Sequence, residues 1–117
     1  MNYLFKNINI VSPEQKLNDR FNLWLLDGKI HKMSYDIFPV DETTEIIDAS
    51  SFVASPGFFD MHVHFREPGF EHKENLFSGA EAAANGGFTG VVIMPNTKPA
   101  IHDASVVKFI QDNSKDL

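Results

Sequence analysis

Short stretches of alternating apolar and polar side chains run through the first 55 residues. In residues 4–11, isoleucine and asparagine alternate, which is the two-residue period of a strand with one buried face. The pair Asp27-Gly28 offers a two-residue hairpin turn between two such stretches. The pattern predicts a β-rich region with extended segments at residues 4–11, 21–26, 29–33, 43–48 and 52–54.

The period changes after Pro56. Residues 58–65 have the composition of a strand, and residues 73–85 repeat apolar side chains at helical spacing. Residues 88–94 form a nearly continuous apolar run, which is typical of a parallel strand covered on both faces. With a last helix after them, these segments have the strand, helix, strand, helix order of an α/β protein.

Glycine and aspartate mark the expected ends of the helices. Asn85-Gly86-Gly87 is a carboxyl-terminal cap by composition, and Asp103 is suited to cap the amino terminus of the last helix. Gly79 lies inside the first helix, where glycine costs about 1 kcal/mol relative to alanine. We therefore expect the backbone of this helix to approach the sheet closely at Gly79.

Composition and charge narrow the classes of function. The chain is 43% hydrophobic and 22% charged, and its net charge of −6 gives no basic surface for nucleic acid or an anionic membrane. The absence of cysteine excludes disulfides and thiolate metal ligands. No apolar run is long enough to span a bilayer. We expect a cytoplasmic protein.

Chemistry-bearing side chains gather in residues 56–66. If this segment is extended, Asp60, His62, His64 and Arg66 share one face, while the apolar side chains at odd-numbered positions share the other. Two neutral imidazoles on one strand face can both bind a metal such as zinc, although a catalytic site needs further ligands. The histidine pair therefore predicts half of a metal site.

The neighbours of the histidine pair could take part in the same site. Asp60 could orient a ligand imidazole or touch the metal itself, and the planar guanidinium of Arg66 suits a substrate carboxylate. A bare His-x-His also occurs by accident in polar strands. The residues that follow therefore decide the interpretation.

The flanking motifs carry a family resemblance. The run 56–66 is followed by Pro68-Gly69 and, after the second predicted strand, by Met94-Pro95-Asn96-Thr97. Together these motifs closely resemble the amino-terminal part of dihydroorotases in the cyclic amidohydrolase superfamily. The resemblance is strong over residues 45–105 and only general before them.

The resemblance implies a fold with two parts. Residues 1–55 would be a small β-sandwich-like domain that acts as a scaffold, and residues 56–117 would begin a metal-dependent (β/α)8 barrel. Such a barrel takes about 250 residues, and 61 of the 117 residues follow Pro56. We expect the first two βα units of a truncated barrel, inactive on its own.

The resemblance also implies roles for particular residues. His62 and His64 would bind one or two zinc ions, with Asp60 supporting a ligand, and His64, Arg66 and Asn96 would border the substrate. Asn96 alone could equally be a turn residue. The implied reaction is zinc-dependent, reversible hydrolysis of (S)-dihydroorotate to N-carbamoyl-L-aspartate in de novo pyrimidine (UMP) biosynthesis. The general base and the remaining ligands would lie beyond the described sequence.

Other functions stay open at this point. One is a sister cyclic amidohydrolase, an allantoinase or a dihydropyrimidinase. Another is a non-catalytic, dihydroorotase-like scaffold for aspartate carbamoyltransferase, although inactive homologues of that type tend to lose the metal histidines. A homo-oligomer is also compatible with the sequence.

The other polar candidates are expected to be solvated: His31, Glu67, His72, Lys73, Glu74, Glu81 and His102.

Overall fold

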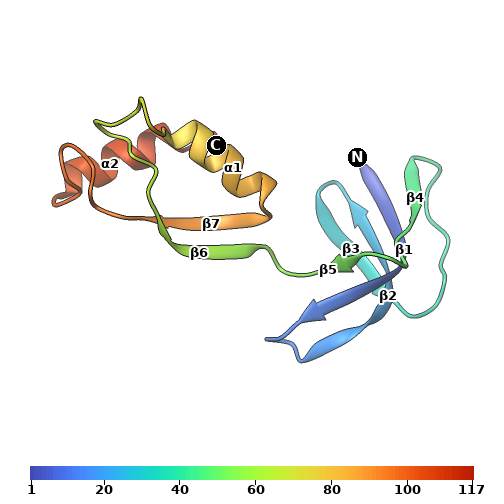
Figure 1. The fold of residues 1–117 in the computed structure, drawn as a ribbon. Helices are drawn as coiled ribbons and strands as arrows, with labels where there is room; N and C mark the ends of the chain where they lie inside the picture. The colour runs from blue at the N-terminus through green and yellow to red at the C-terminus, as the bar shows by residue number, and fades with distance from the viewer. The chain divides into compact units, whose positions relative to one another are not determined.

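The computed structural model describes residues 1–117, which divide into two compact units, Met1–Pro56 and Gly57–Leu117 (Figure 1). The first unit contains only strands, and the second alternates strands with helices. The predicted α/β class with a β-rich amino-terminal part is therefore confirmed.

The first unit is one five-stranded sheet. Its strands are β1 Asn2–Ser12, β2 Leu17–Leu26, β3 Lys29–Ser34, β4 Thr44–Asp48 and β5 Val53–Ala54. The order is β3-β2-β1-β4, and β5 also pairs with β1. β2 runs antiparallel to its two neighbours, whereas β4 and β5 run parallel to β1. The β-rich unit is one sheet in which the first half of β1 pairs with β4 and the second half pairs with β5.

The pairing of β1 with β2 shifts register between Phe5 and Ile8, and Figure 1 shows β1 changing direction along its length. Asn7 has a φ of 58°, and its backbone leaves the regular ladder. Its N–H donates to Oδ1 of Asn22 at 3.2 Å, and its carbonyl accepts from Nη1 of Arg20 at 2.8 Å. Side chains of β2 therefore satisfy the backbone groups that the bulge frees.

The hairpin turn and the core of this unit follow from the sequence pattern. Asp27 and Gly28 have φ values of 49° and 73°, as a type I′ turn requires, so the predicted turn is confirmed. The apolar side chains that alternate along β1 and β2 meet on one face of the sheet. The buried cluster consists of Ile8, Ile10, Phe21, Leu23 and Ala49.

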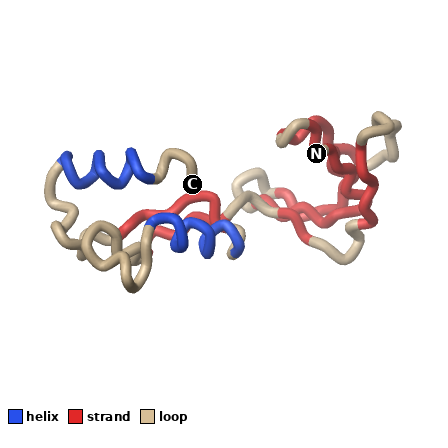
Figure 2. Tube along the Cα trace, turned by 90° about the horizontal axis from the view of Figure 1, so that it is seen from above, coloured by secondary structure: helices blue, strands red, loops and turns tan.

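The second unit contains two parallel strands and two helices. These are β6 Phe58–Val63, α1 Leu76–Asn85, β7 Phe88–Ile93 and α2 Ala104–Asn113. Each strand of this unit is followed along the chain by a helix, which is the βα repeat predicted above. Figure 2 shows helices (blue) in this unit only. Each helix is ten residues long, and neither has the length and hydropathy that a bilayer-crossing helix needs.

Helix α1 begins three residues later than the sequence pattern predicted. The side chain of Asn75 accepts from the Ser78 N–H at 2.8 Å, and the Ser78 hydroxyl accepts from the Asn75 N–H. This capping box fixes the start of the helix. Gly79 is buried, and a Cβ there would lie 2.6 Å from Cδ1 of Phe65. A close approach at Gly79 is therefore present, but it is made by the side chain of Phe65 in the loop after β6 and not by the sheet.

The two faces of the β6-β7 sheet differ. Side chains of β7 and both helices line a shared cavity of about 650 Å3, so the helices cover the same face. Phe59 and Met61 of β6 are instead 62% and 73% exposed. Neither helix covers these two side chains, so part of the apolar face of β6 is exposed in these 117 residues.

Candidate metal and substrate site

The two histidines of the site lie at the carboxyl end of β6. His62 is the penultimate residue of the strand, and His64 begins the loop that follows. Both side chains are exposed, and their ring centroids are 5.2 Å apart with the rings inclined at 67°. The structure therefore places two imidazoles side by side at the end of one strand, where (β/α)8 barrels carry their chemistry.

The strict alternation expected along residues 60–66 is broken. The pairing of β6 with β7 shifts register between Asp60 and Val63, and these two residues line one cavity with Phe65. Oδ1 of Asp60 accepts a hydrogen bond from the backbone N–H of His62 at 2.9 Å. Such a local side-chain bond competes with the strand ladder. Asp60 thus contacts the backbone of His62 directly.

Asn96 brings the end of β7 into contact with the histidine pair. It lies three residues past the end of β7, and its Oδ1 is 2.9 Å from Nδ1 of His64. Because an amide oxygen only accepts, His64 donates from Nδ1–H, which leaves the lone pair of Nε2 free for a metal. The amide N–H groups of Asn96 remain available as donors to a ligand.

Arg66 occupies a left-handed backbone conformation in the same loop. Its φ is 60°, which non-glycine residues rarely adopt outside functional or tightly constrained sites. The Phe70 N–H donates to its carbonyl at 3.0 Å and closes a turn. The guanidinium forms no ion pair with any carboxylate of the chain. Its donors are therefore available to an anionic ligand.

The acidic residues of this loop serve its own structure. Oε2 of Glu67 accepts from the Leu76 N–H at the start of α1 at 2.8 Å, so the expectation that Glu67 is solvated is wrong. No sequence feature indicated this contact, because nine residues separate the partners. Hydrogen bonds from the backbone N–H groups of Gly69 and of Glu71 itself hold the pKa of Glu71 below its usual range. His72 and Lys73 are exposed, as predicted.

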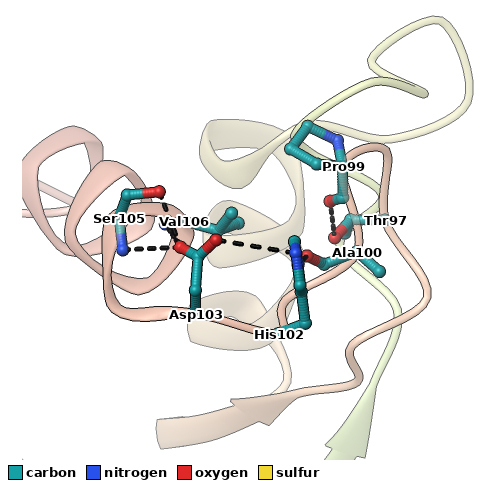
Figure 3. A network of polar contacts seen from close by, with 7 residues as sticks. All are labelled: Thr97, Pro99, Ala100, His102, Asp103, Ser105 and Val106. Carbon is teal, nitrogen blue, oxygen red and sulfur yellow. Dashed lines mark hydrogen bonds and ion pairs between the residues drawn. The ribbon is translucent and has the colours of Figure 1, made fainter.

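A network of polar contacts shapes the loop that carries Asn96 (Figure 3). The buried Thr97 donates from its hydroxyl to the Pro99 carbonyl at 2.8 Å. Asp103 accepts from the Ser105 hydroxyl at 2.6 Å and from the Ser105 N–H at 2.8 Å, which lowers its pKa and confirms it as the cap of α2. His102 is exposed, as predicted. The loop after β7 is therefore held at both ends.

The side chains of His62 and His64 fit part of a metal site. No group of three or more histidine, aspartate or glutamate side chains gathers closely enough to hold a metal ion alone. His62 and His64 supply two exposed imidazoles at one strand end, and one of them has its tautomer set by Asn96. Two nitrogen donors agree with a zinc site that takes its other ligands from elsewhere.

Known proteins resemble this chain along nearly its full length. It is 44% identical over 114 residues to a dihydroorotase of Sulfurihydrogenibium sp. (strain YO3AOP1), covering 97% of this chain and 27% of that protein. It is 41% identical over 114 residues to a dihydroorotase of Aquifex aeolicus (strain VF5), covering 97% and 26%. The chain spans about a quarter of the length of the curated relatives it matches.

Solved structures and a family model agree with these relatives. L-hydantoinase (dihydropyrimidinase) from Arthrobacter aurescens superposes with a TM-score of 0.78 at 26% identity, covering 96% of this chain and 24% of that chain. The family model described as dihydro-orotase-like matches residues 52–116, which include the histidine pair, Arg66 and Asn96. The chain therefore belongs to the dihydroorotase-like family.

Proposed function

We propose that these residues are the amino-terminal quarter of a dihydroorotase, which interconverts (S)-dihydroorotate and N-carbamoyl-L-aspartate in de novo pyrimidine biosynthesis. The observation that carries the proposal is the 2.9 Å contact between His64 and Asn96, because it joins the ends of two adjacent parallel strands at one site. The dihydroorotases that match along 97% of the chain support the same assignment.

In this proposal His62 and His64 hold zinc, as one or two ions. A bound zinc supplies Lewis acidity, which activates water and polarises the amide carbonyl that is attacked. His64 presents Nε2 because Asn96 accepts its Nδ1–H. Asp60 fixes the backbone of His62 through the 2.9 Å bond to its N–H, and so limits how the strand end can move.

Arg66 and Asn96 bind the substrate carboxylate. Arg66 has a planar fork of donors with no protein carboxylate to neutralise it, and Asn96 has amide N–H groups left over after its oxygen binds His64. Both side chains follow the carboxyl ends of adjacent strands. They orient the ring and exclude substrates that lack the carboxylate. Proton transfer to the leaving nitrogen requires a carboxylate from outside these 117 residues.

The remaining parts of the chain have supporting roles. Residues 1–55 are a β scaffold, and residues 56–117 are the first two βα units of the barrel. The exposed apolar side chains of β6 and β7 support this division, since further strands and helices would cover them. The 117 residues alone are inactive, because they lack the other ligands and the proton-transfer group. In this proposal it is the complete protein, and not these 117 residues, that would associate with further copies of itself or with aspartate carbamoyltransferase.

The test is a substrate panel on the complete protein with zinc. We expect turnover of dihydroorotate, loss of turnover after chelation, and recovery with zinc. Preferred turnover of allantoin or a dihydropyrimidine would contradict dihydroorotate as the substrate. It would favour an allantoinase or a dihydropyrimidinase instead. Absence of bound zinc together with co-purification of aspartate carbamoyltransferase would support the non-catalytic scaffold instead.

A further inference from the structure

The loops that follow β6 and β7 touch through their backbones as well as through their side chains. The Lys98 N–H donates to the Pro68 carbonyl at 2.8 Å. Together with the contact between His64 and Asn96, this bond ties the two loops at two separate points. The relative position of the two loops is therefore set within the described chain.

Gly69 makes the backbone contact possible. Its φ is 98°, a conformation that side-chain-bearing residues rarely adopt. A Cβ at this position would overlap the Lys98 carbonyl oxygen and lie 2.6 Å from the Lys98 Cβ and 2.9 Å from its carbonyl carbon. Two of these three atoms belong to the backbone, so the clash could be relieved only by moving the second loop.

A displacement of either loop would also move the proposed substrate-binding residues Arg66 and Asn96. Gly69 lies inside the turn that the Phe70 N–H closes on the Arg66 carbonyl, so displacement of Gly69 shifts Arg66. In the other loop, Lys98 lies two residues from Asn96. The loops rest on α2, where Pro68 and Pro99 line one cavity with Val106.

We infer that Gly69 is a positioning residue for substrate binding: its missing side chain sets the separation of Arg66 and Asn96. This inference rests on the proposed function, in which these two residues bind one carboxylate. Gly69 itself touches no substrate.

The test compares Gly69→Ala with Gly87→Ala in the complete protein. Gly87 is the matched control because its φ is 82°, yet a Cβ there would meet its nearest neighbour, Phe58, at 3.7 Å. Both variants carry backbone strain, and only the first carries the clash with Lys98. We expect Gly69→Ala to raise KM for dihydroorotate by about 10- to 100-fold, with a smaller change in kcat.

Crystal structures of both variants supply a second readout that needs no turnover. In Gly69→Ala, the separation of His64 Nδ1 and Asn96 Oδ1 should exceed hydrogen-bond distance, whereas Gly87→Ala should keep the 2.9 Å contact. Unchanged geometry and KM in Gly69→Ala, or equal changes in both variants, would overturn the inference. Wild-type protein that does not turn over dihydroorotate would overturn the proposed function, while the crystal comparison would still decide the role of Gly69.

A second variant covers the case in which Gly69→Ala does not fold. Thr97→Val removes the hydroxyl that donates to the Pro99 carbonyl but keeps the shape of the side chain. It should loosen the loop after β7 and raise KM for dihydroorotate by a smaller factor than Gly69→Ala does. An unchanged KM and an unchanged contact between His64 and Asn96 in Thr97→Val would then contradict the inference.

Discussion

The two units use their polar side chains for different purposes. In Met1–Pro56, Arg20 and Asn22 bind backbone groups that a bulge has freed, and Trp24 donates to the hydroxyl of Thr44. In Gly57–Leu117, Arg66 has no protein carboxylate as a partner, and the histidine pair lies exposed at a strand end. The difference separates a unit whose polar groups complete its fold from one in which, by our proposal, some polar groups bind a ligand.

The apolar side chains show the same contrast. Seven of the ten buried hydrophobic residues belong to the first unit, and only Phe65, Leu76 and Val106 belong to the second. Both units also expose large apolar side chains, among them Phe52 in the first and Phe59 in the second. Buried apolar area is the main source of folding free energy, so the first unit has the better-formed core.

The largest expected effect compares two phenylalanines in the 117-residue chain. Phe21→Ala removes a core side chain that is 7% exposed, and should lower the free energy of unfolding of the first unit by about 3–5 kcal/mol. Phe59→Ala removes one that is 62% exposed, and should change stability by less than about 0.5 kcal/mol. Urea unfolding measures both. Equal losses would show that the uncovered sheet face is packed after all.

The next effect concerns the histidines of the complete protein. His64→Ala removes a proposed ligand and should weaken zinc binding by more than about 100-fold, since even partners that only support ligands cost 10- to 100-fold. His31→Ala is the control, because this histidine lies in the first unit with its ring 4.5 Å from that of Trp24. Metal titration checks the result. Equal zinc affinity in the two variants would remove His64 from the metal site.

The two arginines of the chain sharpen the comparison further. Arg66→Lys loses the planar fork and should raise KM for dihydroorotate in the complete protein by about tenfold. Arg20→Lys should leave KM unchanged and cost about 1 kcal/mol of stability, because Arg20 donates to the carbonyls of Asn7 and Ser50. Steady-state kinetics and urea unfolding separate the two roles. A changed KM in Arg20→Lys would contradict the assignment of Arg66 to substrate binding and of Arg20 to the stability of the first unit.

The smallest effect is a dependence of α2 on pH. Hydrogen bonds from the Ser105 hydroxyl and from backbone N–H groups lower the pKa of Asp103 below its ordinary value of 3.8. Its contribution to stability is therefore present above pH 3.8 and is lost as the pH falls through the lower, folded-state pKa. Hydrogen exchange at the Val106 amide should accelerate in this window.

Substitutions check that the effect belongs to this cap. Asp103→Asn keeps an acceptor for the cap and should remove the pH dependence. Asp41→Asn, in the first unit, should leave exchange at Val106 unchanged, although the pKa of Asp41 is also lowered, by the hydroxyl of Thr43. Persistence of the pH dependence in Asp103→Asn would assign it to another group.

Much of the fold could be predicted because its rules are local. The turn at Asp27-Gly28 and the cap at Asp103 depend on a few neighbouring residues. The bulge in β6 could not be predicted, since it arises from the competition between the Asp60 carboxylate and the strand ladder for the His62 N–H. The single bent sheet of the first unit depends likewise on contacts of Asn7 with residues 13 and 15 positions away.

The sequence indicates the residue types of the proposed site but not their contacts. His-x-His and the motif at Asn96 indicated a metal and a carboxylate. The bond between His64 and Asn96 spans 32 residues, and its atoms are fixed only when the two loops meet. The contact of Gly69 with Lys98 is equally remote in sequence, and a Pro-Gly pair in a loop indicates a turn without naming what approaches it.

The most direct test of the central claim is anomalous diffraction at the zinc edge from crystals of the complete protein with dihydroorotate. The account predicts a zinc peak within bonding distance of His62 and His64, with the ligand carboxylate held by Arg66 and Asn96. A peak bound to other residues, or a carboxylate that touches neither Arg66 nor Asn96, would contradict it.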